Sequence, residues 1–196
     1  IYSGSQFVAV PGDFDGDRLY DPAVLDKSGG PYSGYYRYYS SRRGYARYYI
    51  TTKWYAPGVL STAGDFDGDG YADPIAFAGG AWYILASRYN YTRYYLLNWC
   101  SAGFTPLCAD YDRDGYGDLM AYHEPSGYWY ILSSRYNYQR YYRPWFGATG
   151  FQPATADFDG DRFADLAVYN KTTGMWYILL SSTGNQRYIS GKWAGN

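Results

Sequence analysis

The stretch that decides the fold is DFDGDGYAD, Asp65–Asp73, which places four aspartates within nine residues. Close copies begin at three other places: DFDGDRLYD at Asp13, DYDRDGYGD at Asp110 and DFDGDRFAD at Asp157. In every copy the aspartates occupy positions 1, 3, 5 and 9 of the loop. With four in each loop, the loops hold 16 of the 18 acidic residues in the chain. Nearly all of the negative charge therefore belongs to one repeated element.

The rest of the sequence repeats with the loops, at spacings of 52, 45 and 47 residues. In the second repeat a lead-in segment, GVLSTAGD, precedes the loop, and DPIAF, WYILAS and YNYTRYYLLNW follow it. These segments are rich in Tyr, Trp, Val and Ile, which favour strands, and Gly, Pro and Asp separate them. Four short strands per repeat at this period are typical of a propeller blade.

We therefore expect a single all-β domain, residues 1–196, made of four tandem four-stranded repeats. Their approximate bounds are 5–56, 57–102, 103–147 and 148–196. The arrangement is expected to be propeller-like, four-bladed if it closes, because one blade cannot cover its own faces and neighbours must stack. An open array of the same repeats fits the sequence equally well.

Four carboxylates in one tight turn point toward a common centre and repel one another unless a cation lies between them. Oxygen-rich sites of this kind suit Ca²⁺, which takes 6–8 oxygen ligands. The first three aspartates match the start of an EF-hand loop, but the glutamate at position 12 is missing and strands flank the loop. We therefore reject a helical EF-hand and expect calcium loops between strands.

The DFDGDG-x-x-D core, followed by DPAV-like and WYIL-like strands, resembles the FG-GAP or VCBS-type repeats of calcium-binding β-propellers, from about Phe7 to Trp193. The resemblance implies one Ca²⁺ per loop, four in total, and an extracellular, secreted or cell-surface location. The ligands that it implies are Asp13, Asp15, Asp17, Asp21, Asp65, Asp67, Asp69, Asp73, Asp110, Asp112, Asp114, Asp118, Asp157, Asp159, Asp161 and Asp165. Arg18 and Arg162 at position 6, and Arg113 at position 4, replace glycines, so these residues have to tolerate the dihedral of the turn.

Tyrosine and arginine crowd the last two expected strands of the repeats, in YYRYY, SRYNYTRYY and SRYNYQRYY. These residues have three interpretations: packing between blades, self-association through sticky faces, or a platform that binds acidic polysaccharides. The candidate interface or ligand residues are Tyr35, Tyr36, Tyr38, Tyr39, Tyr48, Tyr49, Tyr89, Tyr91, Tyr94, Tyr95, Tyr136, Tyr138, Tyr141, Tyr142, Arg88, Arg93, Arg135 and Arg140.

Other motifs in the sequence say less about function. Cys100 and Cys108 are candidates for a local disulfide or for two reduced thiols, and Asn90 and Asn170 begin N-glycosylation acceptor patterns. No catalytic motif is present, so we expect no enzyme. The sequence also predicts no nucleic-acid partner and no membrane span, because it contains no nucleic-acid-binding motif and no run of about 18 apolar residues.

These features predict an extracellular, calcium-stabilised structural protein that assembles with itself, as a homo-oligomer or filament, through its Tyr/Arg-rich faces. The alternative is a carbohydrate-binding or adhesion module. Four divalent cations would change the formal net charge from -1 to +7, so the surface outside the loops would be basic.

Overall fold

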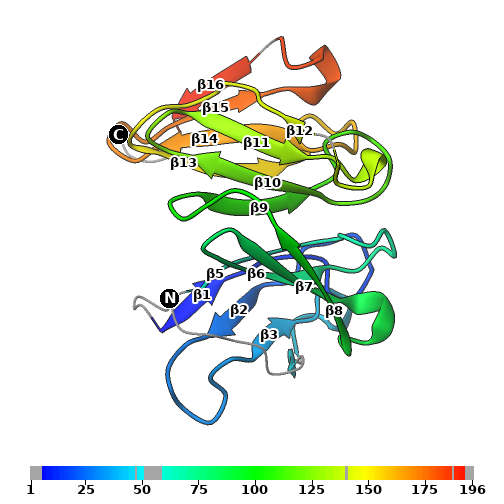
Figure 1. The fold of residues 1–196 in the computed structure, drawn as a ribbon. Helices are drawn as coiled ribbons and strands as arrows, with labels where there is room; N and C mark the ends of the chain where they lie inside the picture. The colour runs from blue at the N-terminus through cyan, green and yellow to red at the C-terminus, as the bar shows by residue number, and fades with distance from the viewer. Residues whose placement is uncertain (1–5, 47, 51–58, 140, 187, 193–196) are drawn as a thin grey trace. The chain divides into compact units, whose positions relative to one another are not determined.

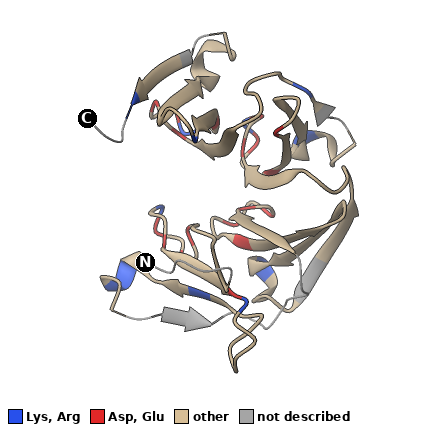
Figure 2. Ribbon diagram, turned by 90° about the vertical axis from the view of Figure 1, so that its left-hand side faces the viewer, with Lys and Arg blue, Asp and Glu red and all other residues tan. Residues whose placement is uncertain are grey.

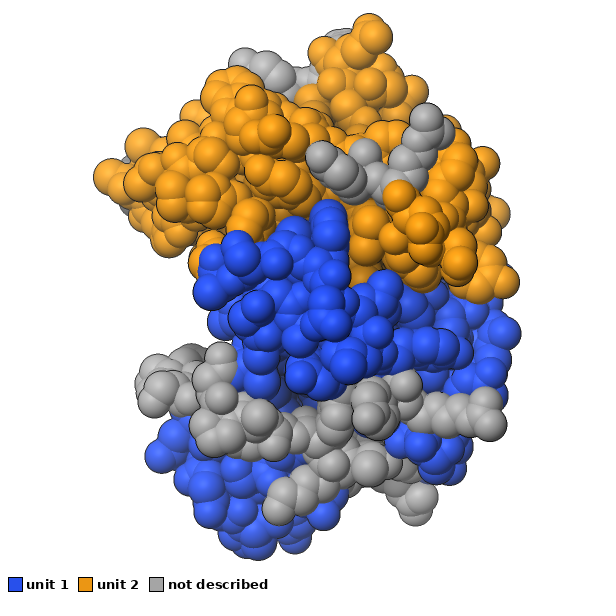
Figure 3. Space-filling view, viewed as in Figure 1, with its two compact units in different colours: residues 1–102 blue, residues 103–196 orange. Residues whose placement is uncertain are grey.

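The computed structural model describes residues 6–46, 48–50, 59–139, 141–186 and 188–192. It contains four antiparallel sheets, and in each sheet the order of the strands in space follows their order along the chain (Figure 1). The expected all-β class and the four strands of each repeat are confirmed. The chain divides into two compact units, residues 1–102 and 103–196, which Figure 3 colours separately. Each unit holds two of the four sheets.

Unit 1 contains the first and second sheets. The first sheet contains β1 (Phe7–Ala9), β2 (Ala23–Asp26), β3 (Tyr36–Tyr39) and β4 (Tyr48–Ile50). The second sheet contains β5 (Leu60–Gly64), β6 (Asp73–Ala78), β7 (Ala81–Ala86) and β8 (Arg93–Asn98). In both sheets an acidic loop connects the first strand to the second.

Unit 2 repeats this plan. The third sheet contains β9 (Thr105–Ala109), β10 (Asp118–His123), β11 (Tyr128–Leu132) and β12 (Tyr141–Tyr142). The fourth sheet contains β13 (Phe151–Ala156), β14 (Asp165–Asn170), β15 (Met175–Leu179) and β16 (Tyr188–Lys192).

A short 3₁₀ turn joins the third strand to the fourth in every sheet, and the sequence did not predict it. These turns are η1 (Ser41–Arg43), η2 (Ser87–Tyr89), η3 (Ser134–Tyr136) and η4 (Ser181–Thr183). Each ends at a left-handed residue: Gly44, Asn90, Asn137 or Gly184. Glycine and asparagine tolerate that conformation better than other residues, which is why the chain turns here.

The 3₁₀ turns correct one part of the sequence analysis. YNYTRYY was expected to belong to a long outer strand, but β8 begins only at Arg93. Arg88 and Tyr89 lie in η2, and Tyr91 has a positive φ of 58° that no strand residue adopts. The same holds for Arg135 and Tyr136 in η3 and for Tyr138, with φ 56°.

Within each unit one sheet packs against the next through a small apolar core. In unit 1, Val10, Leu25 and Tyr36 of the first repeat pack with Val59 and Ala76 of the second. In unit 2 the core joins Leu107, Met120, Tyr122, Trp129 and Ile131 of the third repeat to Ala164, Leu166 and Val168 of the fourth. Alternating burial along β11 agrees with one face turned toward this core.

Candidate metal centres in the acidic loops

The carboxylates of each acidic loop converge as the spacing predicts, and Figure 2 shows the acidic residues concentrated in these loops. In every loop three aspartates each offer an oxygen, and these oxygens lie within 4.8 Å of one another. The triads are Asp13, Asp15 and Asp17; Asp65, Asp67 and Asp73; Asp110, Asp112 and Asp118; and Asp157, Asp159 and Asp165. Asp21, Asp69, Asp114 and Asp161 lie in the same loops outside the triads.

The aspartate at position 1 closes the loop. In the third loop, Asp110 Oδ1 accepts hydrogen bonds from the backbone N–H of Arg113 at 2.7 Å and of Asp114 at 3.2 Å. Its Oδ2 accepts from the N–H of Gly115 at 3.0 Å. The first loop repeats the pattern, with Asp13 accepting from residues 16, 17 and 18. One carboxylate therefore shapes the turn that gathers the others.

The aspartate at position 9 joins the loop to the 3₁₀ turn. Asp21, Asp73, Asp118 and Asp165 are all 0 % exposed. In the third repeat, Asp118 Oδ2 accepts from the N–H of Tyr111 at 2.9 Å, and its Oδ1 accepts from the N–H of Ser134 at 2.7 Å. The equivalent pair of bonds exists in the other three repeats. Position 9 is therefore a structural clasp as well as a candidate ligand.

Serines of the 3₁₀ turns complete the site, and the sequence analysis missed them. Ser134 Oγ donates to Asp114 Oδ1 at 3.0 Å, and Ser87 Oγ donates to Asp69 Oδ1 at 3.0 Å. Ser41 and Ser181 occupy the same place beside Asp17 and Asp161. The signal was visible in the sequence: SRR, SRY, SRY and SST recur 14 to 20 residues after position 9.

The aspartate at position 3 is the least satisfied group of the loop. Asp67 is only 8 % exposed, and neither of its carboxylate oxygens has a hydrogen-bond partner. Asp15 Oδ1 and Asp112 Oδ1 are also buried without a partner. Ser40 and Ser133 each donate to the other oxygen of Asp15 and Asp112, whereas Ala86 stands at that place in the second repeat. Buried anionic oxygens without donors are costly unless a cation contacts them.

Raised pKa values show that burial also disfavours the charged form of several loop carboxylates. Burial raises the pKa of Asp73 to about 7 and those of Asp65 and Asp118 to about 6. It also raises the pKa values of Asp13 and Asp110. A neighbouring carboxylate adds to the shift in each case, although backbone N–H groups oppose it. A cation between the oxygens would remove this penalty, so the donor set fits a metal ion.

Two arginines from the 3₁₀ turns cover the position 3 carboxylates. Arg88 Nε lies 3.7 Å from Asp67 Oδ1, and its guanidinium donates to the Asp67 carbonyl at 2.7 Å. Arg135 Nε lies 3.6 Å from Asp112 Oδ1 and its guanidinium also bonds the carbonyl of Asp112. At these distances the ion pairs offset part of the negative charge, but the carboxylate oxygens that the two arginines approach still accept no hydrogen bond.

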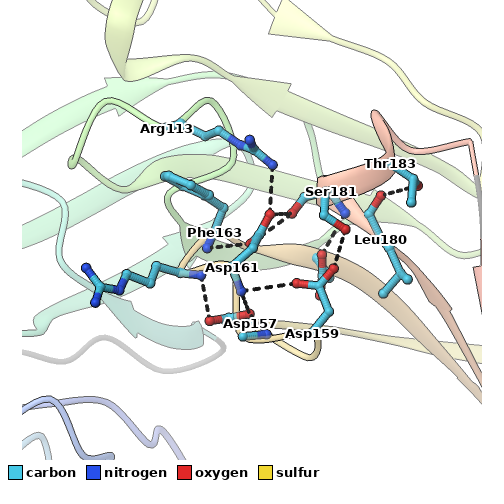
Figure 4. A network of polar contacts seen from close by, with 12 residues as sticks. Arg113, Asp157, Asp159, Asp161, Phe163, Leu180, Ser181 and Thr183 are labelled. Carbon is cyan, nitrogen blue, oxygen red and sulfur yellow. Dashed lines mark hydrogen bonds and ion pairs between the residues drawn. The ribbon is translucent and has the colours of Figure 1, made fainter.

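The three arginines that replace loop glycines adopt the expected left-handed backbone. Arg18 has φ 72°, Arg113 has φ 67° and Arg162 has φ 74°. Arg113 is compensated: its guanidinium lies 4.3 Å from the centre of the Phe163 ring and donates to Asp161 Oδ2 at 2.8 Å (Figure 4). The side chain of Arg113, in the third loop, thus contacts residues of the fourth loop.

The tyrosines divide into packed and exposed groups. Tyr36 was a candidate interface residue, but it is fully buried in the core and its hydroxyl bonds Ser61 at 2.7 Å. Tyr38 is half-buried and stacks on Phe14, with ring centres 5.0 Å apart. Tyr35, Tyr91 and Tyr138 are half-buried as well.

The exposed candidate tyrosines are Tyr39, Tyr89, Tyr95, Tyr136 and Tyr142. Tyr48, Tyr49, Arg93, Tyr94 and Tyr141 lie in the outer strands β4, β8 and β12. Arg140 lies outside the described residues.

The remaining candidate residues lie apart from the loops. Cys100 and Cys108 are not joined by a disulfide, and burial raises the pKa of the Cys100 thiol to about 12. Asn90 is exposed at the end of η2, whereas Asn170 is half-buried and its Oδ1 accepts from the backbone N–H of Thr172 at 2.9 Å. Glycosylation of either asparagine stays a prediction.

Among the described residues, no helix has the length and apolar character needed to cross a membrane.

No protein-family model matches the chain, and a comparison with curated proteins also finds no match. The acidic loops therefore have to be interpreted from their own geometry and chemistry.

Proposed function

We propose that each acidic loop binds one Ca²⁺ and that the ion stabilises the repeat in which it lies. The observation that carries this proposal is that each of the four loops gathers three aspartate oxygens, and that in three loops a buried oxygen at position 3 accepts no hydrogen bond. The donors are all oxygens, which favours hard cations over zinc or copper. Aspartates at positions 1 and 3 would hold the ion in every loop, joined by position 9 or position 5.

Calcium rather than magnesium is proposed because each loop gathers three carboxylates, and Ca²⁺ accepts 6–8 oxygen ligands in a flexible geometry. Mg²⁺ keeps several waters and demands a near-ideal octahedron. The ion would supply charge neutralisation and a fixed loop shape. Its binding energy for the folded state would add to the stability of the fold.

The test is thermal unfolding of the purified chain in millimolar calcium, millimolar magnesium and excess chelator, with equilibrium dialysis to count the ions. We expect about four calcium ions per chain and a Tm at least 10 °C higher in calcium than in chelator. Equal Tm values in calcium and chelator would contradict calcium stabilisation. The variant Asp67→Asn is the matched control, since it should lose one of the four ions.

We further propose that the protein is a non-enzymatic extracellular structural subunit that assembles with itself. The exposed rings of Tyr39, Tyr89, Tyr95, Tyr136 and Tyr142 support an interacting surface, because tyrosine gives large contact area at low entropic cost. Calcium would neutralise the acidic loops, and the remaining surface would then carry net positive charge. Contacts made by the exposed tyrosines would therefore involve no acidic residues. An open, propeller-like stacking of the four sheets and membership of the FG-GAP or VCBS-type repeats are parts of the same proposal.

The second candidate is a carbohydrate-binding module. The same exposed tyrosines favour it, since aromatic faces stack on sugar rings, and the basic surface suits acidic polysaccharides. Negative-stain microscopy in millimolar calcium distinguishes the two. Regular filaments support the structural subunit, whereas discrete single particles that bind glycans saturably support the binding module.

A further inference from the structure

The contact between successive sheets is made by the same positions in both units. In unit 1 this contact uses Val10, directly after the first strand, Leu25 of the second strand and Tyr36 of the third. Counted from the first aspartate of each loop, Leu107 and Tyr122 are the equivalents of Val10 and Leu25 in unit 2. Trp129 is the equivalent of Tyr36 by strand register, because Tyr122 pairs with Trp129 as Leu25 pairs with Tyr36. We call this side of a sheet its forward face. The forward face of the first sheet packs on the second, and that of the third packs on the fourth.

The opposite side, which we call the rear face, receives the preceding sheet. In the second repeat it carries Val59, Ala76 and Tyr83, and in the fourth it carries Phe151, Val168 and Tyr177. The strand registers confirm the equivalence, because Ala76 pairs with Tyr83 and Val168 pairs with Tyr177. In the first sheet Val24 pairs with Arg37 in the same way, and Phe7 stands where Phe151 does.

Among the described residues of unit 1, the rear face of the first sheet lines a hollow. It has a volume of about 580 Å³, and its lining includes Phe7, Ala9, Pro22, Val24, Arg37 and Tyr39. The guanidinium of Arg37 forms an ion pair with the buried Asp26 and lies 5.7 Å from the centre of the Phe7 ring and 5.5 Å from that of the Tyr32 ring. An apolar sheet face of this size, with a cation fixed within it, offers a docking surface for an aromatic side chain.

Among the described residues of unit 2, the forward face of the fourth sheet lines a hollow as well. A second hollow of about 170 Å³ is lined by Phe158, Trp176, Ile178 and Ile189. Trp176 stands where the fully buried Trp129 stands in the third sheet. Phe158 is 37 % exposed, whereas Phe14 at the same place in the first loop is 2 % exposed beneath Ala72 of the second.

We propose that the forward face of the fourth sheet in one copy packs on the rear face of the first sheet in a second copy. The two faces are the counterparts that pack together inside each unit, so a second copy is the partner whose chemistry already matches. The contact joins unlike faces, and a heterologous contact that does not close on itself builds an open chain of subunits. This inference rests on the proposed self-assembly and names its interface.

Two details define the joint. Trp176 of one copy would enter the hollow near Pro22 and Val24, just as Trp129 shares a core with Leu166 and Val168. At the loops the joint differs from the internal ones. The internal junctions bring the N–H of Ala72 to the Asp13 carbonyl at 2.6 Å, and the N–H of Ala164 to the Asp110 carbonyl at 2.9 Å. Tyr20 occupies this place in the first loop, so the bulk of its ring would hold the loops of two copies farther apart.

The test uses three single variants of the full chain in millimolar calcium. Val24→Asp puts a charge into the rear face of the first sheet, and Ile189→Asp puts one into the forward face of the fourth. Leu96→Asp is the matched control, because Leu96 is exposed on outer strand β8 and lines neither hollow. Sedimentation velocity over a hundredfold concentration range measures the assembly state, and circular dichroism checks folding. If Val24→Asp fails to fold, the exposed Tyr39→Asp replaces it.

We expect wild type and Leu96→Asp to form species that lengthen with concentration, and each face variant to sediment as a monomer with at least tenfold weaker association. A mixture of the two face variants should form dimers and nothing longer, because each retains one intact face. Face variants that assemble like wild type, or a mixture that stays monomeric, would overturn the head-to-tail joint while leaving self-assembly intact. A wild type that is monomeric throughout would overturn both this inference and the proposed structural function.

Discussion

The third and fourth acidic loops lie in the same unit and share a sequence pattern, yet they differ in cover. Asp110 and Asp112 of the third loop are half-buried, whereas Asp157 and Asp159 of the fourth are exposed. The third loop is covered by the fourth, through the bond from Ala164 to Asp110 and through the stacking of Arg113. The character of an acidic loop is therefore set by its neighbour as much as by its own residues.

The largest effect should come from the clasp at position 9. Asp118→Ala leaves the backbone N–H groups of Tyr111, Asp112 and Ser134 without an acceptor. We expect a loss of about 3–5 kcal/mol in the free energy of unfolding, since each buried unpaired donor costs about 1–3 kcal/mol. Asp165→Ala should lose less, because only Phe158 and Ser181 donate to that carboxylate. Urea denaturation in saturating calcium measures both, and an equal loss in the two variants would contradict the ranking.

Removing a ligand should distinguish a covered site from an exposed one. Asp112→Asn should weaken calcium binding at the third loop at least tenfold and cost about 1.4 kcal/mol of stability in calcium. In chelator the same variant should be more stable than wild type, because it removes the negative charge from a buried carboxylate whose Oδ1 accepts no hydrogen bond and has only a long ion pair with Arg135. Asp159→Asn should show a smaller change in both conditions. Titration calorimetry and thermal unfolding test this reversal, and a variant destabilised equally in both conditions would argue against a cation.

The pH dependence of stability should change sign with calcium. Without the ion, Asp118 has a folded pKa of about 6, above its unfolded value near 3.9, because burial disfavours its charged form. Protonation then favours the folded state, so Asp118 alone should add about 1 kcal/mol of stability as the pH falls from 7.5 to 5.5, and Asp65 and Asp73, whose pKa values are also raised, should add to this rise. With calcium bound, protons compete with the ion and stability should fall over the same range. Tm should be measured at pH 7.5 and at pH 5.5, once with calcium and once with chelator. A change of Tm with pH in the same direction in both conditions would contradict the prediction.

The smallest effect concerns the backbone of the two loops. Position 6 is Gly115 in the third loop and Arg162 in the fourth, both with positive φ. Arg162→Gly should stabilise the protein by about 0.5–1 kcal/mol, because glycine adopts this conformation without strain. Gly115→Arg should destabilise it by a similar amount. Arg113→Gly is the contrasting control, since relief of strain there is opposed by the loss of the contacts to Phe163 and Asp161.

Much of this architecture could be predicted from the sequence because the decisive features are local. The spacing of Asp65, Asp67 and Asp73 brought their oxygens together as expected, and the two strands that flank this loop pair with each other. The left-handed backbone at Arg18 followed from the glycines at the equivalent position. In these cases a single repeat carried all the information that was needed.

The sequence pattern failed where the partner of a residue lies in another element. Arg88 and Arg135 were expected in the last two strands of their repeats as candidate interface or ligand residues, but they lie in 3₁₀ turns and form ion pairs with carboxylates of the acidic loops. Tyr36 resembled its exposed neighbours in YYRYY and is a core residue, because alternation along β3 turns it toward the second sheet. Charge and aromatic content do not reveal such contacts before the chain is folded.

The position 9 clasp and the simple strand order also govern how the protein folds. Each clasp joins residues only 20, 14, 16 and 16 positions apart, and strands pair with their neighbours along the chain. Such short-range contacts lower the entropic barrier that slows most all-β proteins. A repeat can therefore close its sheet as soon as its own residues are available, and folding can proceed along the chain while later repeats are still being made.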